Sequence, residues 1–418
     1  HKGMGLVPHV FNEETIGKLK GHIAIGHNRY STTGGSHLEH AQPIVVNDAL
    51  AFAHNGNLPS VSALKDFLAG KGTATDGMSD SRLMAEAIGV YMKEGKPLQE
   101  AVRSAYPLFT GAFSALALSG DTLLAVRDRC GIRPLCIGKI NGGTVVASET
   151  CALSTIGARF VRDVEPGEMV VVSEKGMESG QLAAPDPKLD IFEFVYFARP
   201  DSMLLGQSVY EVRKRSGARL ARERKIAADV VIPVPDTAVP VAVGYAQESG
   251  IPFEMGLAKN RYIHRTFIQP EQHVREQGVK LKLSPIPEVI AGKRVAVVDD
   301  SIVRGTTSRQ IVKMLFEAGA AEVHFLISSP PIMFPDFYGI DISKQQDLIA
   351  ASKTVEETRR YLGATSLTYL SFDGLIEATG LPQNVFCTAC FTGEYPIDIK
   401  ERAREFTERK VCYTPFAA

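Results

Sequence analysis

The sequence predicts two folds in one chain: an α+β half of layered sheets with flanking helices, then an α/β half with a mostly parallel sheet. Three observations predict this division. The 418 residues exceed one ordinary domain, which holds roughly 150. The first half has short apolar runs separated by Gly and Asn turns, whereas the second half alternates apolar strands with helices. Between Gly176 and Lys188 the chain becomes polar and proline-bearing, which predicts a boundary.

In the first half, five apolar runs bounded by turn residues predict strands. These runs are Ile44–Val46, Leu50–Ala53, Thr122–Val126, Thr144–Ala147 and Glu168–Val172. Two stretches with apolar residues at helical spacing, Ser81–Met92 and Leu98–Tyr106, predict helices between the strands.

In the second half, the runs Asp229–Pro235, Lys293–Asp299 and Val323–Ile327 predict buried strands. A helix is expected after the first strand, ending near Gln247, and another over Ser308–Ala318. Repeated strand–helix–strand units predict a parallel sheet covered on both faces.

Composition excludes several classes of protein. Lys+Arg 46 against Asp+Glu 47 leaves no basic excess for binding nucleic acid. No uncharged apolar stretch approaches the ~20 residues of a membrane helix. Six cysteines are too few for a disulfide scaffold and are typical of a reducing compartment. We therefore expect a soluble, cytoplasmic protein that acts on small molecules.

The most informative stretch is Val295–Ser308, where an apolar strand ends in Asp299 and Asp300 and a Gly-Thr-Thr-Ser turn opens a helix. The backbone N–H groups and hydroxyls of such a helix start suit a phosphate monoester. Because carboxylates repel phosphate, their expected partners are ribose hydroxyls or hydrated Mg²⁺. The alternative is an ordinary strand–turn–helix, since Asp and Ser also favour turns and caps. A Walker loop is absent from the sequence.

This stretch resembles the signature of type I phosphoribosyltransferases that bind 5-phosphoribosyl-1-pyrophosphate (PRPP). Other segments narrow the resemblance to the glutamine PRPP amidotransferase family, which catalyses the first step of de novo purine synthesis. These segments are Tyr196–Ser202, Val234–Thr237, Lys259–Tyr262, Arg265–Ile268 and Tyr338–Asp341. The resemblance implies a pentosyltransferase that forms 5-phosphoribosylamine from PRPP and glutamine-derived ammonia, releasing pyrophosphate and glutamate.

The resemblance also implies the domains. Residues 1–180 would form an N-terminal-nucleophile glutaminase domain that lacks its start, residues 189–400 a type I phosphoribosyltransferase domain, and residues 401–418 a tail. It further implies a homo-oligomer that purine nucleotides inhibit.

The resemblance assigns PRPP binding to three groups of residues. Asp236 and Thr237 would form a pyrophosphate loop, and residues 259–282 would form a cationic hood that closes over PRPP, although any single cation there has a solvated loop as its alternative. The implied PRPP contacts are Asp236, Thr237, Lys259, Arg261, Lys282, Asp299, Asp300, Ser301, Arg304, Gly305, Thr306 and Thr307. Thr237, Asp299 and Asp300 are the expected Mg²⁺ ligands.

The first half resembles the glutamine site of N-terminal-nucleophile amidotransferases. Arg29 would hold the glutamine α-carboxylate, and Asp80 would pair with its α-ammonium. Asn55 and the Gly56 N–H would form the oxyanion hole. Taken alone, Asn55-Gly56 predicts a hairpin turn and Asp80 a helix N-cap. The residues expected to support this core are Asp128, Gly131, Arg133, Pro134 and Glu149.

The family's nucleophile is a cysteine at the mature N-terminus, whose own α-amine serves as the base. The printed sequence begins at His1, and its first cysteine is Cys130. We therefore expect the polypeptide as printed to be an N-terminally truncated fragment that uses ammonia but not glutamine, with a natural truncation as the alternative.

Cys387-Thr388-Ala389-Cys390 resembles part of the iron–sulfur ligand set found in one branch of the family. At the other two ligand positions the chain has Asp190 and Asp336, and carboxylates are weaker cluster ligands than thiolates. A labile 4Fe-4S cluster, a zinc ion and no metal are all open.

A rival interpretation is a non-catalytic PRPP-binding regulatory protein. The balanced charge argues against a DNA-binding regulator, and the cationic hood favours chemistry. A base-salvage phosphoribosyltransferase would leave the first half unexplained.

Overall fold

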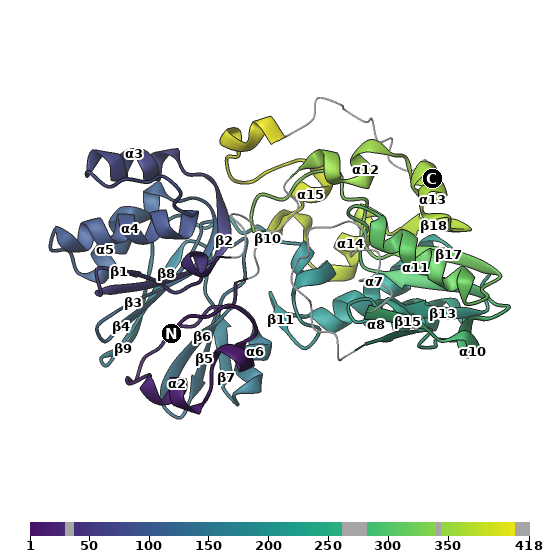
Figure 1. Cartoon of the computed structure of the whole chain (residues 1–418), viewed down its shortest axis with the longest axis horizontal. Helices are drawn as coiled ribbons and strands as arrows, with labels where there is room; N and C mark the ends of the chain where they lie inside the picture. Colours follow the sequence, from purple (N-terminus) through teal and green to yellow (C-terminus); the bar gives the residue numbers. More distant parts are fainter. Residues whose placement is uncertain (30–36, 261–281, 340–343, 406–418) are drawn as a thin grey trace.

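The structure, a computed structural model, describes residues 1–29, 37–260, 282–339 and 344–405. The chain forms two halves, each built around its own sheets (Figure 1). Strands β1 to β9 belong to the N-terminal half, and β13, β16, β17 and β18 form the main sheet of the C-terminal half. Among the described residues no helix has the length and apolar character needed to cross a membrane.

The N-terminal half contains a six-stranded sheet and a three-stranded sheet, both antiparallel. The strands of the large sheet, in spatial order, are β1 (Ile44–Val46), β2 (Leu50–Ser60), β3 (Thr110–Ser119), β4 (Thr122–Arg127), β8 (Glu168–Ser173) and β9 (Gly176–Gln181). The small sheet consists of β6 (Gly143–Ala147), β5 (Cys136–Ile140) and β7 (Arg159–Asp163). All five predicted strands of this half are present.

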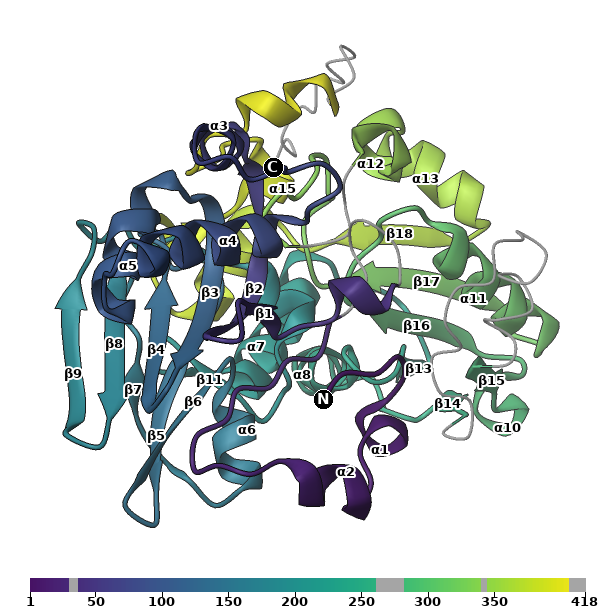
Figure 2. The same cartoon turned by 60° about the vertical axis from the view of Figure 1, so that its left-hand side comes forward.

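Helices cover one face of the large sheet, and the small sheet packs against the opposite face (Figure 2). The helices are α3 (Ser62–Gly70), α4 (Asp80–Lys93) and α5 (Leu98–Ala105). Leu83, Met84 and Ile88 of α4 are fully buried and pack in one core with the sheet residues Phe52 and Phe113. A separate apolar core that includes Leu135 and Val170 lies between the two sheets. These layers confirm the predicted α+β architecture.

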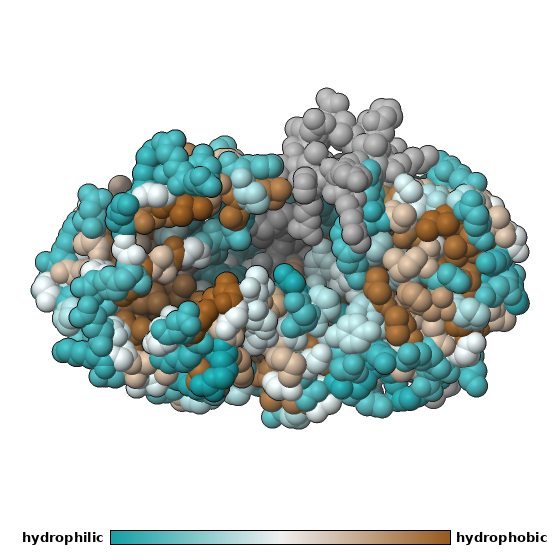
Figure 3. Space-filling view, turned by 90° about the horizontal axis from the view of Figure 1, so that it is seen from below, coloured by the Kyte–Doolittle hydropathy of each residue, from teal (hydrophilic) through white to brown (hydrophobic). Residues whose placement is uncertain are grey.

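The beginning of the chain has little regular structure. Its two short helices, α1 (Val7–Val10) and α2 (Glu13–Lys18), contain no buried residue. Residues 23–29, which end in Arg29, form no strand, and residues 30–36 lie outside the described residues. Apolar side chains are exposed on both halves of the molecule, as the view from below shows (Figure 3).

The C-terminal half is built on a four-stranded sheet whose strands are all parallel. In spatial order they are β13 (Val230–Pro233), β16 (Arg294–Asp299), β17 (Glu322–Ile327) and β18 (Ser366–Tyr369). Side chains alternate along β16: Val295 and Val297 enter one core, and Ala296 and Val298 the other. A sheet with both faces buried confirms the predicted α/β half.

Helices from either side complete the two cores. One face is covered by α7 (Val209–Glu223), α8 (Val239–Ser249) and α14 (Phe372–Thr379), and the other by α11 (Thr306–Glu317) and α13 (Val355–Leu362). The remaining elements are η1 (Leu38–His40), η2 (Tyr106–Leu108), α6 (Thr150–Thr155), β10 (Leu189–Asp190), η3 (Glu193–Phe197), β11 (Met203–Leu204), β12 (Gln207–Ser208), β14 (Leu257–Lys259), β15 (Leu283–Pro285), α10 (Pro287–Ile290), η4 (Gln345–Asp347), α12 (Ile349–Ser352), η5 (Gln383–Val385), β19 (Phe386–Cys387), α15 (Ala389–Thr392) and η6 (Lys400–Glu405).

Two segments link the halves. The polar stretch predicted between Gly176 and Lys188 contains β9, so its first part belongs to the large sheet rather than to a linker. Further along the chain, η6 returns to the N-terminal half beside α3 (Figure 2). There the Glu401 carboxylate accepts hydrogen bonds from the Val61 and Ser62 N–H groups, both at 3.1 Å.

Candidate functional site

The acid pair lies at the carboxyl end of β16, as the sequence predicts. Asp299 is 9 % exposed, and its Oδ1 accepts a hydrogen bond from the Asp300 N–H at 2.9 Å. Asp300 Oδ1 accepts one from the Ser301 hydroxyl at 2.7 Å. No ion pair to either carboxylate occurs within the described ranges. This is the position where ligands bind in open α/β sheets.

The two carboxyl groups resist ionisation. Burial, and then the charge of Asp300, raises the pKa of Asp299 well above its usual range. Burial raises the pKa of Asp300 to about 6, although the Ser301 hydroxyl and the Arg213 charge oppose the rise. Two buried acids that repel each other favour the arrival of a cation or of hydroxyl donors.

The helix that follows starts with an open N-terminus. Gly305 precedes α11 with φ +75°, and no side chain caps the helix. The positive φ favours glycine at this position, and a Cβ there would also crowd the end of the Ile349 side chain, 2.8 Å from its Cδ1. The helix begins at Thr306, two residues before the predicted start, and no side chain of the described residues caps its first N–H groups. Exposed Arg304 lies before it, 3.3 Å from Asp347.

Asp236 and Thr237 lie at the same end of the sheet as the acid pair, because β13 and β16 are parallel neighbours and both residues follow the carboxyl end of β13. The Val234 N–H donates to the Val298 carbonyl at 2.8 Å. The Pro235–Asp236 peptide is cis. Exposed Asp236 forms an ion pair with Lys259 at the end of β14.

The two ends of the predicted hood are neighbours. Lys259 pairs with Leu283 across β14 and β15, and the Asn260 N–H donates to the Lys282 carbonyl at 2.8 Å. Arg261 and the other hood cations, Arg265, Arg275 and Lys280, lie outside the described residues.

The hairpin turn predicted at Asn55-Gly56 is wrong. Both residues lie inside β2, opposite Ser114 and Phe113 of β3. Gly56 has φ +145°, and a Cβ there would lie 2.0 Å from the Ala112 carbonyl oxygen. The glycine is therefore needed for a close backbone contact inside a strand, which an Asn-Gly pair does not reveal in the sequence.

Asp80 lies beside this part of β2. Its Oδ2 accepts a hydrogen bond from the Leu58 N–H at 3.1 Å, and its Oδ1 accepts one from the Ser81 N–H at 2.7 Å. The side chain is 18 % exposed, so it keeps access to a ligand. The cap of α4 is Ser79, whose hydroxyl accepts from the Arg82 N–H, and not Asp80.

A buried polar network that sequence reasoning missed lies beside Asp80. The His54 ring lies 3.1 Å from the Ser81 hydroxyl and 3.2 Å from the Ala112 carbonyl. Gln42 Oε1 accepts from the His54 N–H at 2.6 Å. A histidine directly before Asn55 was the available signal, but its partners are 27 and 58 residues away along the chain.

Arg29 lies in the same neighbourhood. Burial lowers the pKa of His27 to about 4, and the charges of His54 and Arg29 lower it further. His27 therefore lies within electrostatic reach of both Arg29 and His54.

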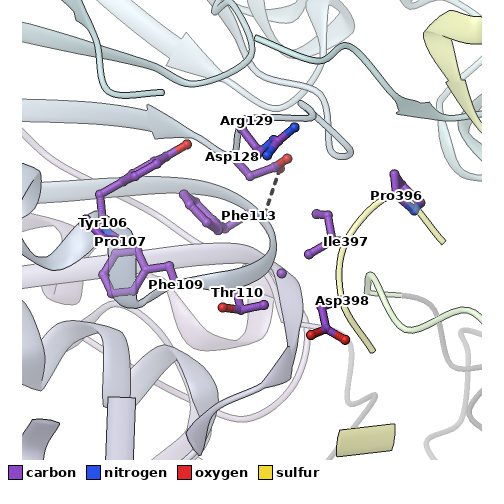
Figure 4. A pocket seen from close by; sticks show the side chains of 11 residues that line it. Tyr106, Pro107, Phe109, Thr110, Phe113, Asp128, Arg129, Pro396, Ile397 and Asp398 are labelled. Carbon is purple, nitrogen blue, oxygen red and sulfur yellow. Dashed lines mark hydrogen bonds between the residues drawn. The ribbon is translucent and has the colours of Figure 1, made fainter. Parts of the chain in front are cut away.

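The residues expected to support the core are held by hydrogen bonds. Asp128 is buried, and its carboxylate accepts from the N–H groups of Phe113 at 3.1 Å and Cys130 at 2.8 Å (Figure 4). Gly131 follows with φ +59°. Glu149 accepts from the Arg199 N–H at 2.8 Å, which joins the two halves.

A pocket of about 320 Å³ opens beside Asp128 (Figure 4). Tyr106, Phe109 and Phe113 line one side, and Pro396, Ile397 and Asp398 line the other. The Asp128 carboxylate is already occupied by backbone N–H groups, so the polar side chains left to a ligand in this pocket are those of Tyr106, Thr110, Arg129 and Asp398.

The predicted iron–sulfur residues meet in one buried place. Asp190 pairs with Cys387 across β10 and β19, and the charges of Asp190 and Asp336 raise the pKa of Cys390, after burial as the main cause. The Arg133 guanidinium lies 3.8 Å from Asp190 and 3.2 Å from Glu193.

These residues do not fit an iron–sulfur cluster. Half of the four donors are carboxylates, and such clusters are held by thiolates. In the described part of the chain, no group of three or more His, Cys, Asp or Glu side chains is arranged to hold a metal ion. Asp190, at one of the expected ligand positions, forms an ion pair with Arg133.

Comparisons with known proteins agree with the division of the chain into two halves. A glutamine amidotransferase domain model matches residues 27–155, and a phosphoribosyl transferase domain model matches residues 211–329. An amidophosphoribosyltransferase of Synechococcus elongatus is 49 % identical over 412 residues, covering 97 % of this chain and 84 % of the relative. One of Bacillus subtilis is 46 % identical over 409 residues, covering 96 % and 85 %.

Solved structures agree as well. An allosteric regulatory enzyme of purine biosynthesis is 45 % identical and superposes with a TM-score of 0.88, over 94 % of this chain and 86 % of that one. A glutamine PRPP amidotransferase from B. subtilis complexed with ADP and GMP is also 45 % identical, with a TM-score of 0.87 over 94 % and 88 %.

Proposed function

The chain belongs to the amidophosphoribosyltransferase family, pentosyltransferases of purine biosynthesis, and we propose that its two halves divide that reaction between them. The C-terminal half binds PRPP, and ammonia displaces pyrophosphate at C1 to give 5-phosphoribosylamine. The N-terminal half binds the glutamine that supplies the ammonia. The observation that carries the proposal is the buried acid pair directly before the uncapped N-terminus of α11.

We assign the 5′-phosphate to the start of α11. The N–H groups of Thr306 and Thr307 and their hydroxyls are donors, and the helix dipole favours an anion there. Ser301, Arg304 and Gly305 complete this loop. Asp299 and Asp300 accept hydrogen bonds from the ribose hydroxyls. The N–H groups that bind the phosphate are donors only and cannot take this role.

Mg²⁺ fits the same edge. Asp299 and Asp300 are two oxygen donors without an ion-pair partner among the described residues, and Mg²⁺ in phosphate sites is usually held by one or two carboxylates plus phosphate and water. Thr237 adds a hydroxyl. When bound, Mg²⁺ neutralises charge on the pyrophosphate leaving group.

Pyrophosphate departure also needs cations from the protein. Lys259 and Lys282 are adjacent at the base of the hood, and Arg261 follows Asn260 in the sequence. Lys259 already pairs with Asp236, so PRPP would replace one anionic partner by another. Closure of the hood would exclude water, which competes with ammonia for C1.

For glutamine, we propose that Arg29 binds the α-carboxylate and Asp80 the α-ammonium. Asn55 and the Gly56 N–H then stabilise the oxyanion. The partial exposure of Asp80 and the fixed position of β2 support this assignment.

The test of the main proposal measures pyrophosphate release from PRPP with Mg²⁺ and ammonium chloride. We expect turnover by the printed chain and a loss of roughly a hundredfold or more in Asp299→Asn, because removing one electrostatic contact to the transition state costs this much. Glu317→Gln, on the far end of α11, is the matched control. PRPP binding without pyrophosphate release would favour the non-catalytic regulator instead.

Three further predictions rest on the family. Inhibition by purine nucleotides is supported by the B. subtilis relative complexed with ADP and GMP. A cytoplasmic location is supported by the free thiols at Cys130, Cys136, Cys151, Cys387 and Cys390. Assembly into a homo-oligomer would be measured by light scattering.

A further inference from the structure

The pocket beside Asp128, here called the seam pocket, lies between the two halves of the molecule (Figure 4). One wall comes from η2, the start of β3 and the turn after β4 in the N-terminal half. The other wall is formed by residues 396–398, which precede η6 in the C-terminal half. The residues assigned above to PRPP and to glutamine are not among those that line it. Its volume of about 320 Å³ is therefore open to a different ligand.

The wall from the N-terminal half is aromatic and fixed in place. Phe113 is 2 % exposed, and its ring meets those of Tyr106 and Phe109 edge to face, with ring centroids 5.5 and 5.6 Å apart. The Tyr106 hydroxyl also donates to the Arg127 carbonyl at 3.3 Å. Because each ring is held by the next, this wall can receive an apolar group without rearranging.

The wall from the C-terminal half is apolar and is held as well. The Ile397 N–H donates to the Tyr338 hydroxyl at 3.1 Å, and the Ile397 carbonyl accepts from the same hydroxyl at 2.7 Å. Tyr338 is itself buried, and Pro396 continues the wall. Two preformed apolar walls favour a ligand whose middle is a ring or a short apolar chain.

The two ends of the seam pocket carry opposite charges. Figure 4 shows Arg129 at one end and Asp398 at the other. Arg129 is exposed and donates through Nη2 to Asp186 at 3.3 Å, but a guanidinium has five N–H groups, so others remain for a ligand. Asp398 Oδ1 accepts from the Lys400 N–H at 2.9 Å, whereas its Oδ2 lies 3.8 Å from the Lys400 ammonium. A cation and an anion are thus presented to a ligand on either side of an apolar middle.

We propose that the seam pocket binds a small elongated zwitterion, apolar in the middle, with a carboxylate at one end and an ammonium at the other. The carboxylate pairs with the Arg129 guanidinium and the ammonium with Asp398. An α-amino acid such as glutamine carries both charges on one carbon, whereas this pocket separates their partners by the length of an apolar wall. The inference goes beyond the proposed function and depends on neither reaction.

The probe that tests this proposal is 4-(aminomethyl)benzoate, a ring with the two charged groups at opposite ends. Benzoate and benzylamine each lack one of those groups. Binding to the full chain is measured by ligand-observed NMR titration. We expect the zwitterion to bind with a dissociation constant of about 1 mM or lower, and each of the other probes about threefold to fivefold more weakly, the effect of one exposed ion pair.

Two variants test the ends of the pocket separately. Arg129→Gln should weaken the zwitterion and benzoate about threefold to fivefold and leave benzylamine unchanged. Asp398→Asn should weaken the zwitterion and benzylamine by the same factor and leave benzoate unchanged. Asp121→Asn, an exposed aspartate beyond the opposite end of β3, is the matched control and should alter none of the three. All three side chains are exposed, so the fold should tolerate each change.

A fluorescent variant locates the ligand. Because the chain contains no tryptophan, Phe109→Trp places a single indole in the wall of the pocket. Its fluorescence should change with the zwitterion at the midpoint that the NMR titration gives for the same variant. Binding to this variant without a change in fluorescence would place the ligand elsewhere and overturn the proposal.

Other results would overturn it too. They are a zwitterion that does not bind at about 10 mM, ten times the expected dissociation constant, equal binding of the three probes, displacement of the zwitterion by L-glutamine, or unchanged binding in both end variants. Pyrophosphate release from PRPP is measured separately, so failure of the proposed function and failure of this inference are distinguishable.

Discussion

At the scale of single residues, a close backbone contact sets the role of Gly56, and burial sets the charge state of Glu193. Gly56 has no side chain because the backbone carbonyl of Ala112 fills the space where a Cβ would stand. Glu193 is buried next to a cation, and burial raises its pKa to about 7 despite Arg133. In each case a neighbour that is distant in the sequence sets the property of the residue.

We predict that Gly56→Ala destabilises the protein by at least about 2 kcal/mol and abolishes glutamine binding, because a methyl group 2.0 Å from the Ala112 oxygen must displace β2 or β3. Thermal unfolding and glutamine titration measure the two effects. Gly72→Ala, at an exposed position of similar φ sign with no atom near its Cβ, is the control for backbone strain alone. Equal effects of the two variants would contradict the close-contact explanation.

Glu193 gives the protein a pH dependence with a defined sign. Its folded pKa of about 7 lies above the usual value near 4.3, so the fold favours the protonated acid. The stability contributed by that proton is complete below about pH 4 and is lost as the pH rises to about 7. We predict that the melting temperature falls between pH 5 and pH 8, and that Glu193→Gln makes this fall shallower. An unchanged slope in the variant would rule Glu193 out as its source.

At the scale of elements, β2, β16 and α11 bear the proposed chemistry because of how they end or are interrupted. β16 stops at two carboxylates, α11 starts without a cap, and β2 is irregular after Asn57. The first N–H groups of a helix have no partner within the helix, so a helix start without a capping side chain offers them to a ligand. The paired elements β10 and β19, in contrast, hold Asp190 and Cys387 in a closed, buried arrangement.

We predict that the protein purified without oxygen contains far less than one iron atom per chain and shows no charge-transfer absorbance near 400 nm. Asp190 and Asp336 replace two thiolates, and Arg133 already pairs with Asp190. Elemental analysis and absorbance spectroscopy measure both, with zinc determined on the same sample. Stoichiometric iron that is lost in Cys387→Ser would show that the two carboxylates do serve as ligands.

At the scale of the whole molecule, the halves are joined by contacts of different kinds. Arg133 of the N-terminal half pairs with Asp190 and Glu193, Glu149 accepts from Arg199, and Glu401 caps α3. The ion pair of Arg133 is almost fully buried. Removing one partner of a buried pair leaves an uncompensated charge and lowers stability far more than breaking an exposed pair does.

We predict that Arg133→Met destabilises the protein by about 3 kcal/mol, because it leaves buried acids without their cation. The double variant Arg133→Met, Glu193→Gln should recover part of the loss, since it removes one of those acids. Chemical denaturation of the four proteins in the cycle measures the coupling. Additive effects of the two substitutions would show that the pair does not interact.

Much of the fold followed from local patterns. The run from Val295 to Asp299 could only be a buried strand, and its acid pair pointed to the PRPP site. The short strand Ser366–Tyr369 at the sheet edge was not predicted, because four residues carry too weak a pattern. The hairpin expected at Asn55-Gly56 failed because the reason for that glycine is Ala112, which lies on another strand.

The sequence by itself determined the two fold classes, the acid pair with its helix start, and the resemblance to one enzyme family, since these depend on residues that are neighbours along the chain. Only the tertiary structure decided that His54 and Ser81 lie beside Asp80, that Arg133 pairs with Asp190, and that Asn57 meets Phe337. These contacts join residues tens to hundreds of positions apart, and such pairings arise from packing, which no local pattern encodes.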